Sequence, residues 1–106
     1  MRRKERDVVW AEECQARERK RREQEKAERE KEREYFLEKK ERLERKLGRY
    51  KSEIVSALEE PYLSDEERDC MVLLFHEIFR IKEELRKADS TLLRLEREDA
   101  QANEEE

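Results

Sequence analysis

Glycine and proline are almost absent from this chain of 106 residues, which contains one residue of each. Folds that pack several short elements into layers need tight turns, and turns are built largely from Gly, Pro and Asn. Asn also occurs only once. These shortages argue against a globular enzyme fold and favour long, uninterrupted elements.

Residues that carry chemistry are equally scarce. The single histidine, His76, has no metal-ligand spacing to Cys14 or Cys70, and no glycine-rich phosphate loop or catalytic dyad is visible. We therefore expect a non-enzymatic protein with no metal site and no cofactor. Both cysteines are expected to be free thiols in a reducing compartment.

Long apolar runs are missing as well. No stretch of 18 apolar residues is present, and the amino-terminal residues lack the apolar core of a signal peptide. A cytoplasmic protein without direct membrane insertion is expected.

What the chain has in abundance is charge. Asp, Glu, Lys and Arg make up 55% of it, with 31 acidic and 27 basic residues and a net charge of −4. Because the two signs are interspersed, no strong positive field draws the chain to nucleic acid, and we expect no nucleic-acid partner. A composition rich in Ala, Glu, Lys, Leu and Arg is typical of long helices and coiled coils, so an all-α fold is predicted.

Residues 1–34 are predicted to form a highly charged helical segment. Acidic and basic residues four apart stabilise a helix that has no apolar face. Three such pairs are Glu13 with Arg17, Glu18 with Arg22, and Glu25 with Arg29. A solvated helix is the simplest interpretation. The alternative is that Trp10, within the apolar residues 8–11, anchors on another helix or on a partner.

Residues 35–60 form the second segment, where an apolar heptad seam begins. Its members are Phe36, Leu43, Leu47, Tyr50, Ile54 and Ala57, with Lys40 at the one charged step. Nothing breaks the chain between this segment and the first, so one long helix is predicted. Gly48 interrupts the pattern at a cost of about 1 kcal/mol relative to Ala, and a close approach of another helix would explain it.

The turn at residues 61–64 is the clearest local signal. Pro61 ends the preceding helix, because it excludes the α conformation at the residue before it. Ser64 then caps a new helix, and Glu67 completes a capping box with it. The new amphipathic helix is predicted over residues 65–100, followed by an acidic, frayed tail at 101–106.

The third segment carries a complete seam of alternating three- and four-residue steps. Its members are Met71, Leu74, Ile78, Ile81, Leu85, Ala88, Leu92 and Leu95. A four-residue linker makes neighbouring helices antiparallel. We therefore predict a coiled-coil-like helical hairpin, which becomes a three-helix bundle if residues 1–34 pack against it.

This last helix has more apolar residues than one seam needs. Val72, Phe75 and Phe79 form a second stripe that continues to Lys82, Arg86 and Leu93. On the preceding helix, Leu37 and Val55 flank the seam. Such a stripe needs a cover. In one interpretation a third helix or a second copy of the chain packs on the stripe, and in the other a partner protein docks on it. The predicted partner-binding residues are Val72, Phe75, Phe79, Lys82, Arg86, Leu37 and Val55.

The order of these features resembles a known family. The matching segments are Phe36-Leu37-Glu38-Lys39, Leu43-Glu44, Glu53-Ile54, Pro61, Ser64-Asp65-Glu66-Glu67-Arg68, Leu74, Glu77-Ile78, Ile81 and the acidic tail. Together they resemble the carboxyl-terminal half of the bMERB domain of MICAL, MICAL-like and EH-domain-binding proteins. The resemblance covers about two-thirds of the chain.

The resemblance implies binding and not catalysis. Domains of this family bind GTP-loaded Rab small GTPases in membrane trafficking, and they can fold against other domains of their own protein. It implies a Rab site on the two hairpin helices, where the apolar stripe lies, and recruitment to endosomal or exocytic membranes through that partner. The alternative is a self-associating coiled-coil rod or cytoskeletal spacer.

Overall fold

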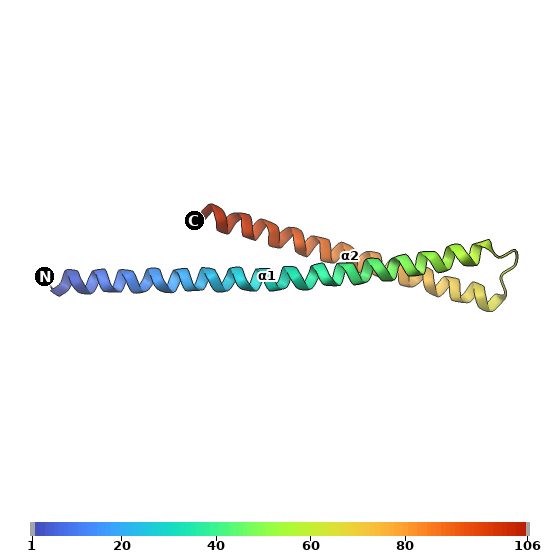
Figure 1. Ribbon diagram of the computed structural model, residues 1–106, viewed down its shortest axis with the longest axis horizontal. Helices are drawn as coiled ribbons and strands as arrows, with labels where there is room; N and C mark the ends of the chain where they lie inside the picture. The colour runs from blue at the N-terminus through green and yellow to red at the C-terminus, as the bar shows by residue number, and fades with distance from the viewer. Residues whose placement is uncertain (1, 106) are drawn as a thin grey trace. The chain divides into compact units, whose positions relative to one another are not determined.

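The computed structural model describes residues 2–105 and consists of two long helices. Helix α1 spans Arg2–Glu59 and helix α2 spans Asp65–Glu105, and residues 2–105 contain no strand. The second half of α1 and α2 run antiparallel as a hairpin (Figure 1). The predicted all-α helical hairpin is therefore confirmed. The chain divides into two compact units, Met1–Glu32 and Arg33–Glu106.

The first unit is a solvated stretch of helix. None of the side chains of residues 5–32 is buried, and Val8, Val9 and Trp10 are exposed. Helix α1 continues without a break from this unit to Glu59, as the absence of a helix breaker predicted.

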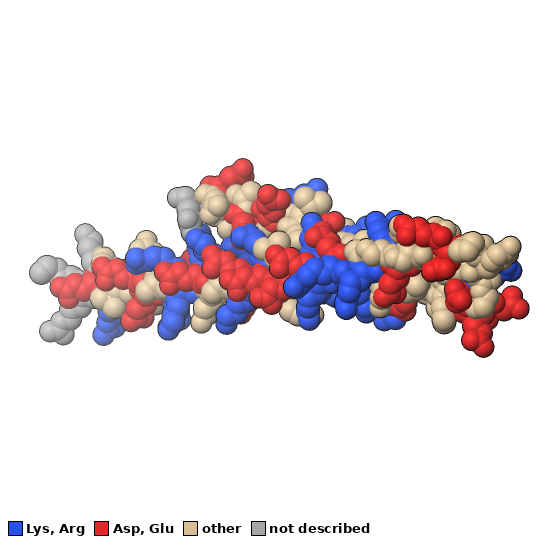
Figure 2. All heavy atoms as spheres, turned by 45° about the vertical axis from the view of Figure 1, so that its right-hand side comes forward, with Lys and Arg blue, Asp and Glu red and all other residues tan. Residues whose placement is uncertain are grey.

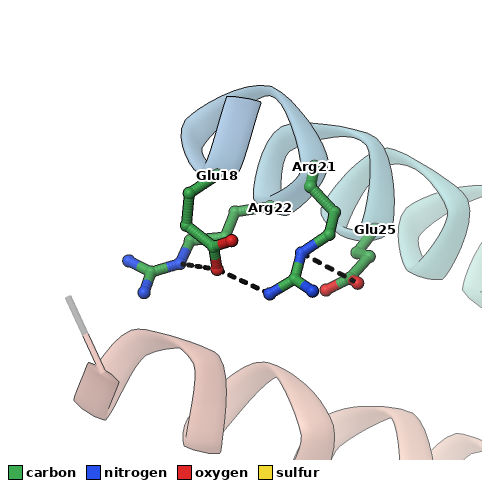
Figure 3. A network of polar contacts seen from close by, with 4 residues as sticks. All are labelled: Glu18, Arg21, Arg22 and Glu25. Carbon is green, nitrogen blue, oxygen red and sulfur yellow. Dashed lines mark hydrogen bonds and ion pairs between the residues drawn. The ribbon is translucent and has the colours of Figure 1, made fainter. Parts of the chain in front are cut away.

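Ion pairs along the helix stabilise this first unit. Glu18 contacts Arg22 at 3.5 Å, as its spacing predicted, and also contacts Arg21 at 2.5 Å. Arg21 reaches on to Glu25 at 3.9 Å, so four side chains form a chain of alternating charge (Figure 3).

The second unit contains the hydrophobic core along the predicted seam. Ile54, Met71 and Ile78 are buried together near the turn, and Leu47, Tyr50, Ala57, Leu63 and Leu74 pack against them. Farther along α2, Ile81, Ala88 and Leu95 are buried as well. Every seam position of both helices is at least half-buried, which confirms the seam.

The turn occupies residues 60–64. Helix α1 ends at Glu59, two residues before Pro61, and α2 begins at Asp65. At the start of α2, the Glu67 N–H donates to Ser64 Oγ at 3.1 Å, and the Arg68 N–H donates to the Ser64 carbonyl at 3.0 Å. The Ser64 hydroxyl in turn donates to Glu67 Oε1 at 3.2 Å. The predicted cap is thus present, with the Glu67 carboxylate bound to the serine hydroxyl.

Ion pairs join the two helices of the hairpin. Lys40 Nζ lies 2.9 Å from Asp89 Oδ1, and Arg33 pairs with Asp99. Lys40 is the charged step of the seam, and its pKa is raised by the hydrogen bond to Asp89 and by the charge of that carboxylate. These pairs mark the register of the antiparallel helices.

Two local predictions differ from the structure. A Cβ added to Gly48 would meet no atom within 4 Å, so the expected close helix approach at this residue is wrong. Helix α2 also continues to Glu105 instead of ending near residue 100. Gln101, Ala102 and Glu104 are good helix formers, and Ala102 is half-buried.

Candidate partner-binding site

The candidate site begins with a second apolar stripe on α2. Residues three, four and seven apart lie on one side of a helix, so Val72, Phe75 and Phe79 share a side that the seam residues do not use. Their side chains are 53%, 44% and 66% exposed. We call these three residues the aromatic face. An exposed face with two phenylalanines is the kind of surface that a protein partner covers.

Two basic residues extend this face along α2. Lys82 is exposed. Arg86 is held by Glu83, since its Nε donates to Glu83 Oε2 at 3.1 Å and its Nη2 donates to Oε1. This forked hydrogen bond raises the pKa of Arg86 and lowers the pKa of Glu83. The Arg86 guanidinium is therefore oriented before any partner arrives.

Leu37 lies apart from the aromatic face. It lines a shallow hollow with Leu92, close to the Arg33–Asp99 ion pair. Thirteen residues separate Leu92 from Phe79, which is about 20 Å along a helix. The structure therefore does not bring Leu37 together with the aromatic residues.

Val55 lies at the level of the aromatic face. It follows Ile54, which is buried with Met71 and Ile78, and its own side chain is exposed. Leu58 is three residues farther along α1, on the same side as Val55, and is also exposed. The sequence interpretation missed Leu58, although its three-residue spacing from Val55 was a usable signal.

The exposed Tyr62 in the turn is a second omission. It is the most exposed large apolar side chain among the described residues, at 88%. It lies in the linker, outside any helical period, so no periodic signal pointed to it. Together with Leu58 it adds apolar surface at the turn end of the hairpin.

No group of three or more His, Cys, Asp or Glu side chains that could hold a metal ion occurs within the described part of the chain. Cys14 and Cys70 are free thiols. The search of residues 2–105 for a helix long and apolar enough to cross a bilayer finds none.

Comparison of the chain with protein-family models, curated proteins and solved structures finds no match. Function must therefore be inferred from the residues and geometry of the hairpin.

Proposed function

We propose that the hairpin is a non-enzymatic, bMERB-like interaction module that binds the GTP-loaded form of a Rab small GTPase. The observation that carries the proposal is the aromatic face. Val72, Phe75 and Phe79 stay exposed on a helix whose seam is already buried against α1. The family resemblance implies a Rab site on the same two hairpin helices.

The aromatic face supplies the apolar centre of the contact. Phe75 and Phe79 pack on the apolar surface between the two switch segments of the GTPase, and Val72 extends that contact. The switches are ordered only when the γ-phosphate and its Mg²⁺ are present, so binding depends on GTP. A contact of standard size buries about 1,200–2,000 Å² in total.

The basic residues act at the edge of this contact. Lys82 and the pre-oriented Arg86 face acidic side chains of the GTPase, where they favour the correct docking orientation more than they add affinity. Val55 extends the contact onto α1, whereas Leu37 lies apart from it. The module then works in the cytoplasm and reaches endosomal or exocytic membranes through its partner.

The test compares nucleotide states and two matched variants. Binding to a panel of Rab GTPases, each loaded with a GTP analogue or with GDP, is measured for the wild type, Phe79→Asp and Leu73→Asp. Leu73 is as exposed as Phe79 at 66% but lies outside the aromatic face, so it controls for a new charge on α2. We expect GTP-dependent binding that only Phe79→Asp weakens. Equal binding in both nucleotide states would contradict the proposal.

The alternative function is a structural rod that associates with itself. The 58 residues of α1 and the apolar surface left on α2 favour it, because a second copy of the chain could cover that surface. Light scattering at several concentrations separates the two functions. A stable dimer that Phe79→Asp converts to a monomer supports the rod, and a monomeric wild type supports docking to a GTPase.

A further inference from the structure

A stripe of four basic side chains lies on α1, away from the aromatic face of α2. Arg42, Arg45, Lys46 and Arg49 line one common surface. Their spacing of three, one and three residues places them on one side of the helix over two turns. Basic side chains gather into a patch on the face of the hairpin that Figure 2 displays. We call these four residues the basic stripe.

The basic stripe brings four basic side chains together on one surface, and none of their charges is neutralised by an ion pair within the described part of the chain. Arg33, Lys40 and Arg80 all pair with carboxylates. By contrast, none of the four stripe residues forms an ion pair with any residue that the structure describes. Lys46 lies 5.8 Å from the centre of the Tyr50 ring, which leaves its charge unneutralised.

Helix stability does not explain this arrangement. Like charges four residues apart destabilise a helix by roughly 0.2–0.5 kcal/mol per pair, and the stripe contains two such neighbours, Arg42 with Lys46 and Arg45 with Arg49. The Glu18–Arg22 region of the same helix alternates its charges and forms internal ion pairs. Glu38, Glu41 and Glu53 lie four residues from Arg42, Arg45 and Arg49, yet none of these carboxylates pairs with them in the described structure. The four basic charges therefore stay open to an external anion.

The length of the stripe restricts the kind of anion. From Arg42 to Arg49 the helix rises about 10 Å. Glu38 and Glu53 lie four residues before and after these positions, on the same side of α1. A bilayer surface or a nucleic-acid backbone would extend past both ends and bring its phosphates against the two glutamates. A short anionic segment fits between them.

We propose that the basic stripe binds an acidic peptide segment of a partner protein, with about four carboxylates spread over two helical turns. Arginine suits this ligand because its planar guanidinium binds a carboxylate through two parallel hydrogen bonds. The stripe lies on α1 and the aromatic face on α2, so the site does not depend on Rab binding.

The test measures binding of a fluorescent peptide to the full 106-residue chain by anisotropy. The peptide is a helical, alanine-rich sequence with Glu at positions 1, 4, 5 and 8, and a peptide with Gln at those positions is its control. The stripe variant is Arg45→Glu with Arg49→Glu. Lys51→Glu with Lys87→Glu is the matched control, since it changes net charge equally at exposed residues outside the stripe. Circular dichroism verifies that each variant keeps its helices.

We expect the wild type and the matched control to bind the Glu peptide, and the stripe variant to bind about tenfold more weakly or not at all. Binding should also weaken as salt rises, because exposed charges are screened. Phosphatidylserine vesicles and a DNA duplex are tested in parallel. The proposal is overturned if the wild type ignores the Glu peptide, if both variants lose affinity equally, or if vesicles or DNA bind through the stripe and the peptide does not.

Discussion

At the scale of single residues, Gly48 is a site where the chain is less stable than it could be. Gly in the middle of a helix costs about 0.8–1.0 kcal/mol relative to Ala. Its φ is not positive, and an added Cβ would meet no atom within 4 Å. Gly48→Ala should therefore raise the free energy of unfolding by up to about 1 kcal/mol, measured by urea denaturation. A lower stability than wild type would show that another surface packs against this position.

Leu95 and Leu93 form a matched pair for testing the seam. The Leu95 side chain is 0% exposed, and the Leu93 side chain two residues earlier is 54% exposed. Leu95→Ala should lower the free energy of unfolding by about 2–5 kcal/mol, because it removes buried methyl groups and leaves a cavity. Leu93→Ala should change it by about 0.5 kcal/mol or less. Equal losses in urea denaturation would show that Leu93 is buried too.

At the scale of helices, the cap at Ser64 sets where α2 begins. Its hydroxyl accepts the Glu67 N–H and its carbonyl accepts the Arg68 N–H. Ser64→Ala should lower the free energy of unfolding by about 0.5–2 kcal/mol, since a helix-end N–H loses its partner. Ser90→Ala, at an exposed position inside α2, is the control and should not destabilise the chain. No loss from Ser64→Ala would mean that water caps the helix equally well.

The ion pair between Lys40 and Asp89 links the two helices in a way that pH can test. Asp89 raises the pKa of Lys40 in the folded chain above its ordinary value of 10.5. The folded chain thus holds this proton more tightly than the unfolded chain does. The resulting stabilisation is fully present when the pH is below the ordinary pKa of lysine. It is lost as the pH rises through the raised pKa of Lys40.

Comparison of the wild type with Lys40→Met isolates this effect from other titrating groups. The difference between their urea midpoints should be constant near neutral pH and should shrink in alkali above the raised pKa. Lys51→Met, which removes an exposed lysine from the same helix, should show no such pH dependence. A wild-type advantage that stays constant into strong alkali would rule out a contribution from the Lys40 charge.

The helices and their seam could be predicted because their signals are local. Pro61 and Ser64 mark the turn, and the step pattern of residues 71–95 marks the buried side of α2. The separation of Leu37 from the aromatic face could not be predicted, because it depends on how the two helices align. The Lys40–Asp89 ion pair shows which residues of α1 and α2 lie opposite one another, and the spacing of residues in the sequence does not.

The basic stripe was missed for a different reason. Along the linear sequence its members alternate with Leu43 and Glu44, so the charge there looks mixed. Only the 3.6-residue turn of the helix brings Arg42, Lys46 and Arg49 to one side. The average charge of a sequence window therefore does not reveal that the helix gathers its basic residues on one side.

At the scale of the whole chain, the two units are stabilised by different forces. Among residues 5–104, all the side chains that are buried lie between Ile54 and Leu95. The residues up to Glu32 contribute ion pairs that remain largely solvent-exposed, and such pairs add only about 0–1 kcal/mol each. Burial of apolar surface thus stabilises the hairpin, and helix propensity with weak charge pairing sustains the rest of α1.

This division predicts the result of a truncation. Residues 33–106 alone retain every side chain that is buried in the described part of the chain. Their free energy of unfolding in urea should therefore match that of the full chain within about 0.5 kcal/mol. A peptide of residues 1–32 should be partly helical, and its ellipticity should fall as salt screens the Glu18–Arg22 pair and its neighbours. A hairpin whose free energy of unfolding fell by more than about 1 kcal/mol on truncation would contradict this division. The charged segment would then stabilise the hairpin, and its exposed ion pairs would contribute more free energy than such pairs usually do.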